Sequence, residues 1–252
     1  MTDKMQFPGE MHLEVRLSEE AANARVIKLV VRSPADGGKE GKRGACWRVR
    51  DVVRAFVEAI DAGVFNLADG EYAEILHTTA REQDGERIET WDLKTPRIDP
   101  EAFGVLARML WAACSRAVSI VENAREEQLA VRALPPPRTV RATPWEIAKH
   151  ISDEAKDAIV KVCFEKDAPP EVVTETQRTL RAWAALVACG GFTGASGFPI
   201  SAAVMGDYGT ELECEVFASF EAIAVGPDGW GALWNALRRI HQHAPIARVE
   251  ML

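Results

Sequence analysis

Two helix starts with the same residue pattern stand 127 residues apart in this chain. Residues 100–110 read PEAFGVLARML and residues 227–237 read PDGWGALWNAL, so a proline, an acid, an aromatic residue, a glycine and two leucines recur in order. Residues 52–65 (VVRAFVEAIDAGVF) and 179–192 (TLRAWAALVACGGF) are separated by the same spacing. The two blocks give eight identities in 25 aligned positions, where about one or two are expected by chance. The shared offset predicts an internal duplication.

The two halves predict the same order of elements. Each half has a strand (26–32 or 158–165), a helix (47–62 or 170–189), a two-stranded hairpin, the helix that begins at Pro100 or Pro227, and a last strand (117–123 or 245–252). This β-α-β-β-α-β order is the ferredoxin-like one. We therefore expect an α+β protein made of two ferredoxin-like halves packed with pseudo-twofold symmetry. The expected domains are residues 1–123 and 145–252, joined by a proline-rich linker over 124–144. The sequence does not decide between one continuous sheet and two.

Local patterns support these elements. Five apolar residues recur with helical spacing along the first helix, namely Val49, Val52, Val53, Phe56 and Ile60, and they predict its buried face. Gly63 and Gly190 follow the first helix of each half, where a left-handed residue commonly ends a helix. The segments HLEVRLS and WEIAKHI precede the first strands and could each form an edge strand or a turn of helix.

Composition excludes several classes of protein. With 47% hydrophobic residues and a net charge of −8, the chain can bury a core but lacks the basic face that nucleic-acid binding needs. No apolar run reaches the length of a membrane span, and no signal peptide is visible at the N-terminus. The five cysteines are scattered without CxxC spacing, which indicates reduced thiols. We expect a cytoplasmic protein that binds neither nucleic acid nor membrane.

The halves differ at three segments, and a specialised site is expected among these differences. Residues 34–45 form a loop rich in glycine and lysine, residues 78–95 predict a long charged hairpin, and residues 193–205 form a loop of small residues. Loops on a rigid scaffold carry function more often than core positions do. Free variation of surface segments is the alternative.

Three carboxylates on one predicted strand face are candidate binding residues, namely Glu211, Glu213 and Glu215. They predict a solvated sheet face, an acidic docking surface for a basic partner or, as the weakest alternative, paired carboxylates for acid–base work. Trp91, with Trp47 and Trp145, lies near predicted element edges, so one of the three could be an exposed contact residue.

Other candidates are weaker. Ser196 lies in GGFTGASGF, which lacks the lysine of a phosphate loop and reads better as a helix end followed by a loop. His241 and His243 could offer two imidazoles, but no further ligand stands at a familiar spacing. The sequence predicts no metal, no cofactor and no catalytic residue.

The sequence leaves two functions open, and they belong to different functional classes. The first is a non-catalytic acidic binding protein, either of the bacterial inhibitor or immunity type or another protein-interaction protein, with a basic protein partner. The alternative is a small-molecule sensor or enzyme with its site between the repeats. The oligomeric state is not predicted.

Overall fold

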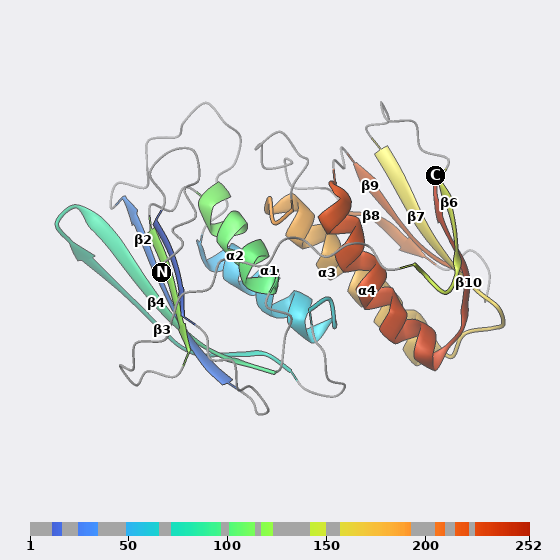
Figure 1. Ribbon diagram of the computed structural model, residues 1–252, viewed down its shortest axis with the longest axis horizontal. Helices are drawn as coiled ribbons and strands as arrows, with labels where there is room; N and C mark the ends of the chain where they lie inside the picture. The colour runs from blue at the N-terminus through green and yellow to red at the C-terminus, as the bar shows by residue number, and fades with distance from the viewer. Residues whose placement is uncertain are drawn as a thin grey trace. The chain divides into compact units, whose positions relative to one another are not determined.

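The chain is a mixed α+β protein. Its computed structural model describes residues 12–16, 25–34, 49–65, 72–96, 101–113, 117–122, 142–149, 157–192, 205–209, 215–221 and 225–252. These residues form two five-stranded sheets and four helices (Figure 1). The chain divides into two compact units. The N-terminal unit comprises Met1–Asp61 and Phe65–Pro137, and the C-terminal unit comprises Ala62–Val64 and Arg138–Leu252.

The N-terminal unit has one sheet with the strand order β1-β5-β2-β4-β3. Strand β1 pairs in parallel with β5, and the other pairs are antiparallel. Its elements are β1 (His12–Arg16), β2 (Arg25–Pro34), α1 (Val49–Asp61), β3 (Glu74–Gln83), β4 (Glu86–Thr95), α2 (Glu101–Ala112) and β5 (Ala117–Glu122).

The C-terminal unit has its own sheet with the strand order β6-β10-β7-β9-β8. Again the first strand, β6, pairs in parallel with the last, β10, and the other pairs are antiparallel. Its elements are β6 (Glu146–Lys149), β7 (Asp157–Phe164), α3 (Pro170–Ala188), β8 (Met205–Gly209), β9 (Glu215–Glu221), α4 (Pro227–His243) and β10 (Ile246–Met251). The order of helices and strands is thus the same in both units, and each unit has a separate sheet.

Helix α1 buries the face that its sequence predicts. The side chains of Val49, Val52, Val53, Phe56 and Ile60 are all buried, and α1 contacts α2 within the N-terminal unit. The matching helix α3 contacts α4, β8 and β9, with Trp183 fully buried. The core of each unit therefore lies between its helix pair and one face of its sheet (Figure 1).

Both predicted helix-ending glycines have the left-handed conformation. Gly63 and Gly190 each have a φ of 75°. After α3, the N–H of Gly190 donates to Val187 O and the N–H of Gly191 donates to Leu186 O. These two bonds form a Schellman motif, which satisfies carbonyls at the end of the helix.

The short segments before the first strands form edge strands in both units. His12–Arg16 and Glu146–Lys149 are β-strands at the ends of their sheets. The predicted linker lies outside the described residues except for 142–144. No helix in the described part of the chain is long and apolar enough to cross a membrane.

Candidate interaction surface

The N-terminal unit carries a hairpin whose two strands, β3 and β4, are each ten residues long. Asp84 and Gly85 join the strands, with φ values of 52° and 75°. Positive φ at both residues is typical of the tight turn that follows the twist of a hairpin, and Asp-Gly is a favoured pair for it. A Cβ at Gly85 would meet nothing within 4 Å. Glycine is therefore favoured here by its positive φ and not by a lack of space for a side chain.

This hairpin is longer than the described part of its counterpart in the C-terminal unit, where residues 210–214 lie outside the described ranges. Strands β8 and β9 have five and seven residues. The sequence predicts the difference, because residues 78–95 have only a trimmed equivalent in the second half. The sequence comparison thus indicates extra length that the shared scaffold does not require.

Strand β3 lies outside the hydrophobic core. Its side chains from Leu76 to Gln83 are all exposed, and only Ile75 is half-buried. On β4, in contrast, Trp91, Leu93 and Thr95 are buried. The hairpin thus has one strand anchored in the core and one strand accessible on both faces.

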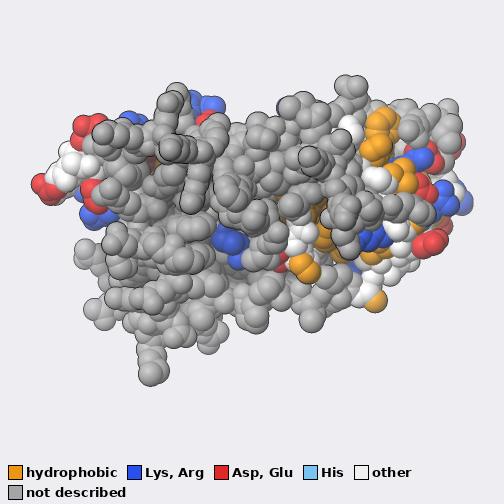
Figure 2. Space-filling model, turned by 90° about the horizontal axis from the view of Figure 1, so that it is seen from above, with side chains coloured by type: hydrophobic (Ala, Val, Ile, Leu, Met, Phe, Trp, Pro, Cys, Tyr) orange, Lys and Arg blue, Asp and Glu red, His pale blue; other side chains and the backbone are white. Residues whose placement is uncertain are grey.

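The hairpin has an acidic excess. Residues 74–95 contain six acidic and three basic side chains. Arg87 Nε lies 2.7 Å from Glu89 Oε1, and Glu86 pairs with Arg32 of β2 at 3.6 Å. Glu82 and Asp84 form no ion pair with any described residue. Figure 2 shows acidic and basic side chains gathered at the left end, where Figure 1 places this hairpin.

Of the three predicted carboxylates, the structure describes only Glu215. Glu211 and Glu213 lie outside the described residues. Glu215 opens β9 and is 8% exposed, and its Oε2 lies 2.8 Å from Lys161 Nζ on β7. The expectation that Glu215 lies on a wet strand face is therefore wrong, because a neighbouring strand supplies a lysine that neutralises the carboxylate.

Cys163 lies beside the ion pair of Lys161 and Glu215. It lies opposite Glu215 on β9 and opposite Arg248 on β10, and its Sγ donates to Glu215 Oε1 at 3.9 Å. Burial raises the pKa of the Cys163 thiol, the carboxylates of Glu250 and Glu215 raise it further, and Arg248 acts in the opposite direction. Because thiolates are the reactive form, this cysteine is suited to packing and not to nucleophilic chemistry.

Three tryptophans, Trp47, Trp91 and Trp145, were candidates for an exposed contact residue. The structure describes two of them, and neither is exposed. Trp91 and Trp145 are each only 5% exposed, and Trp47 lies outside the described residues. Trp91 is buried because β4 turns it toward the core beside Leu29 of β2. It cannot be the exposed contact residue that the sequence suggests.

The two histidines have different surroundings. His241 Nδ1 accepts a hydrogen bond from the N–H of Ile246 at 2.9 Å, and its ring packs against Trp145 with a centroid distance of 5.5 Å. His243 is exposed. Among the described residues no three potential ligands gather in a metal-binding group. His241 is used in the turn from α4 to β10, and Ser196 lies outside the described residues.

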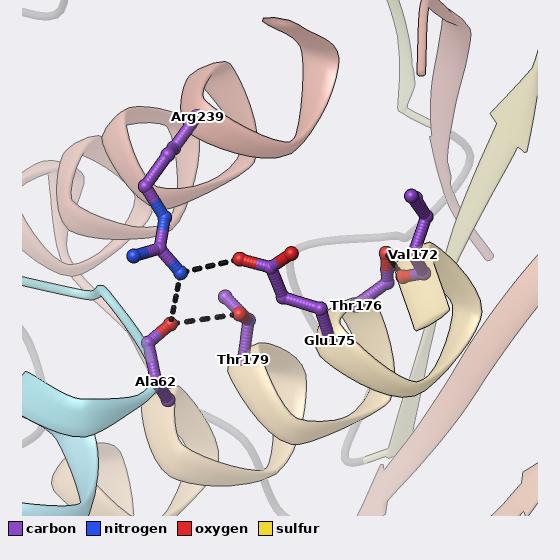
Figure 3. Close-up of polar contacts among 6 residues, drawn as sticks. All are labelled: Ala62, Val172, Glu175, Thr176, Thr179 and Arg239. Atoms are coloured by element: carbon purple, nitrogen blue, oxygen red, sulfur yellow. Dashed lines mark hydrogen bonds and ion pairs between the residues drawn. The ribbon is translucent and has the colours of Figure 1, made fainter. Parts of the chain in front are cut away.

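A partly buried polar cluster in the C-terminal unit was not predicted from the sequence (Figure 3). Thr179 Oγ1 donates to Ala62 O at 2.9 Å. Arg239 Nη2 donates to the same carbonyl at 3.4 Å and to Glu175 Oε1 at 2.5 Å. A Cβ on Gly63 would lie 2.2 Å from Arg239 Cζ. We call Ala62, Gly63, Glu175, Thr179 and Arg239 the Arg239 cluster.

The Arg239 cluster has a structural role. Ala62 follows the last residue of α1, and carbonyls at the end of a helix lack partners within it. Thr179 and Arg239 supply those donors. The sequence marks Gly63 as a helix end, but it does not mark Glu175, Thr179 or Arg239, because a charged or hydroxyl side chain on an amphipathic helix is usually interpreted as a surface residue.

Fold and site together define a two-unit α+β protein with one elongated acidic hairpin. No protein-family model matches the chain, and no curated protein matches it. A solved structure of an unknown protein from Galdieria sulphuraria is similar, with 11% identity, 90% of this chain and 97% of that chain covered, and a TM-score of 0.25. A protein described as a glycine cleavage system transcriptional repressor has 7% identity, 91% and 98% coverage and a TM-score of 0.26. Neither TM-score reaches 0.5, so the argument depends on the residues themselves.

Proposed function

We propose that this chain is a non-catalytic binding protein of the inhibitor or immunity type, with a basic protein as its partner. The observation that carries the proposal is the β3–β4 hairpin, which has ten residues in each strand, an exposed outer strand and an acidic excess. Complementary charge steers association and selects partners of opposite sign. A hairpin extended beyond the needs of the fold suits such a role.

We also propose that the two units arose by duplication of one ferredoxin-like β-α-β-β-α-β ancestor. The recurring sequence blocks support this, as do the equivalent strand orders of the two sheets. Gly63 and Gly190 stand 127 residues apart, and both have a φ of 75°. On this view one copy kept a short hairpin and the other gained a long one, which is how a repeated scaffold acquires a single binding surface.

Affinity capture tests the proposed function. The full chain serves as bait in a lysate of cells that carry its gene, and each captured protein is then purified and mixed with the chain. We expect a basic protein that forms a stoichiometric complex by light scattering and whose affinity falls as salt is raised. If only acidic or substoichiometric proteins are recovered, the proposed function is wrong.

A further inference from the structure

Strand β3 is an open edge of the N-terminal sheet. It is the last strand in the order β1-β5-β2-β4-β3, and among the described residues it pairs with β4 alone. An edge strand presents alternate N–H and C=O groups away from its sheet, and these groups can pair with a further strand. The backbone of β3 is therefore a surface with unused hydrogen-bonding capacity.

The regular part of this edge is seven residues long. The pairing register of β3 with β4 shifts between Ile75 and His77, which places a bulge at Leu76. From His77 to Gln83 the pairing continues without interruption. Such a run has the length of an ordinary strand, so it offers a complete template for one more strand.

This run carries only part of the usual protection of an edge. Natural sheets block edges with proline, with charged side chains (lysine above all), with β-bulges, or with very short strands. Of these devices the run has the charges of Arg81 and Glu82, and the bulge at Leu76 lies beside it. Residues 77–83 read HTTAREQ and contain neither proline nor lysine, and every one of them is exposed. Thr78, Thr79 and Ala80 at its centre are small, so an added strand could approach closely.

We propose that residues 77–83 of β3 dock an extended basic segment of a partner protein as an added strand. This inference rests on the proposed function, because it names the surface and the chemistry of the same partner. The charge of the occupant follows from the whole hairpin, whose six acidic side chains outnumber its three basic ones, because Arg81 and Glu82 balance within the run itself. That excess opposes a second copy of the same hairpin and favours lysine or arginine on the docked strand. Main-chain bonds would give affinity and the charges would give selectivity.

Labelled peptides test the edge directly with the full chain. The probe is fluorescein-Lys-Val-Lys-Val-Thr-Val-Lys-Val-Lys, and the control peptide has glutamate in place of every lysine. We expect fluorescence anisotropy to show binding of the lysine peptide only. Methylation of the peptide N–H groups along one edge should weaken binding about tenfold or more, since the added-strand bonds are lost, while methylation along the other edge should leave binding unchanged.

Two proline variants test the protein side. Thr79→Pro and Ala80→Pro fall on neighbouring residues, so one removes an outward N–H and the other removes an N–H that bonds β4. The first is tolerated on an edge strand and the second is not. We expect the variant that keeps a wild-type melting temperature to lose affinity for the lysine peptide. If neither variant folds, the methylated peptides alone decide the matter.

Several results would overturn the proposal. One is absence of binding by the lysine peptide, and another is binding that is indifferent to methylation on either edge. A dimer in sedimentation that the tolerated proline variant abolishes would assign the edge to a second copy instead. A captured basic partner that binds the tolerated variant as tightly as wild type would overturn the edge docking while leaving the proposed function intact.

Discussion

The guanidinium of Arg239 occupies the space where a side chain on Gly63 would lie. A Cβ built on Gly63 falls 2.2 Å from Arg239 Cζ, and the same guanidinium donates to Ala62 O and to Glu175. Glycine is therefore favoured at position 63 for two reasons, its φ of 75° and the present position of the Arg239 guanidinium, which would have to move away from a Cβ.

Gly63→Ala and Gly85→Ala separate these two reasons. Both glycines have a φ of 75°, but a Cβ at Gly85 meets nothing within 4 Å. We expect Gly85→Ala to lower the free energy of unfolding by about 1 kcal/mol through backbone strain. Gly63→Ala should cost about 2 kcal/mol, because the guanidinium must also leave its acceptors. Urea denaturation measures both values.

The matched background for this comparison is Arg239→Ala. Without the guanidinium, Gly63→Ala should cost no more than Gly85→Ala does, since only the strain remains. Equal costs of the two substitutions in the wild-type background would contradict the account of the Arg239 cluster.

Thr179→Val tests the hydroxyl that binds Ala62. Thr179 and Thr176 are both fully buried on α3, but Thr179 bonds Ala62 O while Thr176 bonds Val172 O in its own helix. We expect Thr179→Val to cost about 1 kcal/mol of stability. Thr176→Val should change stability by less than about 0.5 kcal/mol, because the hydroxyl only supplements a helical bond. Thermal denaturation of the two variants checks this, and a larger loss for Thr176→Val would refute it.

Lys161→Met tests the ion pair with Glu215. The side chains of Lys161 and Glu215 are 16% and 11% exposed, so removing the ammonium group leaves a poorly solvated carboxylate. We expect a loss of about 2 kcal/mol in the free energy of unfolding. The double variant Lys161→Met/Glu215→Met should recover most of that loss, because apolar pairs replace buried ion pairs at little cost. A double variant less stable than Lys161→Met alone would show that Glu215 stabilises the fold without its partner.

Because of Cys163, we expect the free energy of unfolding to fall as pH rises in the alkaline range. Burial and the nearby carboxylates of Glu250 and Glu215 raise the pKa of its thiol in the folded chain. The folded state then holds this proton more tightly than the unfolded state does, so the contribution is complete below the unfolded pKa of about 8.5 and is lost as pH rises toward the folded pKa. Between about pH 8 and pH 10, the stability of wild type should fall more steeply than that of Cys163→Val. Parallel pH dependences for the two proteins would be the contrary result.

Local patterns predicted the scaffold well, since the residues concerned act through their neighbours in sequence. The face of α1 follows from the spacing of Val49, Phe56 and Ile60, and the left-handed Gly63 and Gly190 follow from helix ends. The long hairpin followed from comparing the two halves.

Contacts between distant residues were not predicted. The alternation that placed Glu215 on a wet face describes only its own strand, and it carries no information about Lys161, which lies 54 positions earlier on β7. Arg239 and Ala62 are 177 positions apart, and no local sequence pattern indicates that they are in contact. Trp91 was misjudged because a period of two gives the alternation of a strand but not which face the helices cover.

The most direct test of the central claim is the affinity of the captured basic partner for two charge variants. Glu82→Lys/Asp84→Asn changes the hairpin, and Asp84→Asn keeps a residue that tolerates a positive φ. Glu165→Lys/Asp167→Asn makes the same change, with the same spacing, at two exposed positions of the C-terminal unit. The account predicts that the hairpin variant loses about tenfold in affinity at low salt while the control keeps wild-type affinity. Equal affinities for the two variants would contradict it.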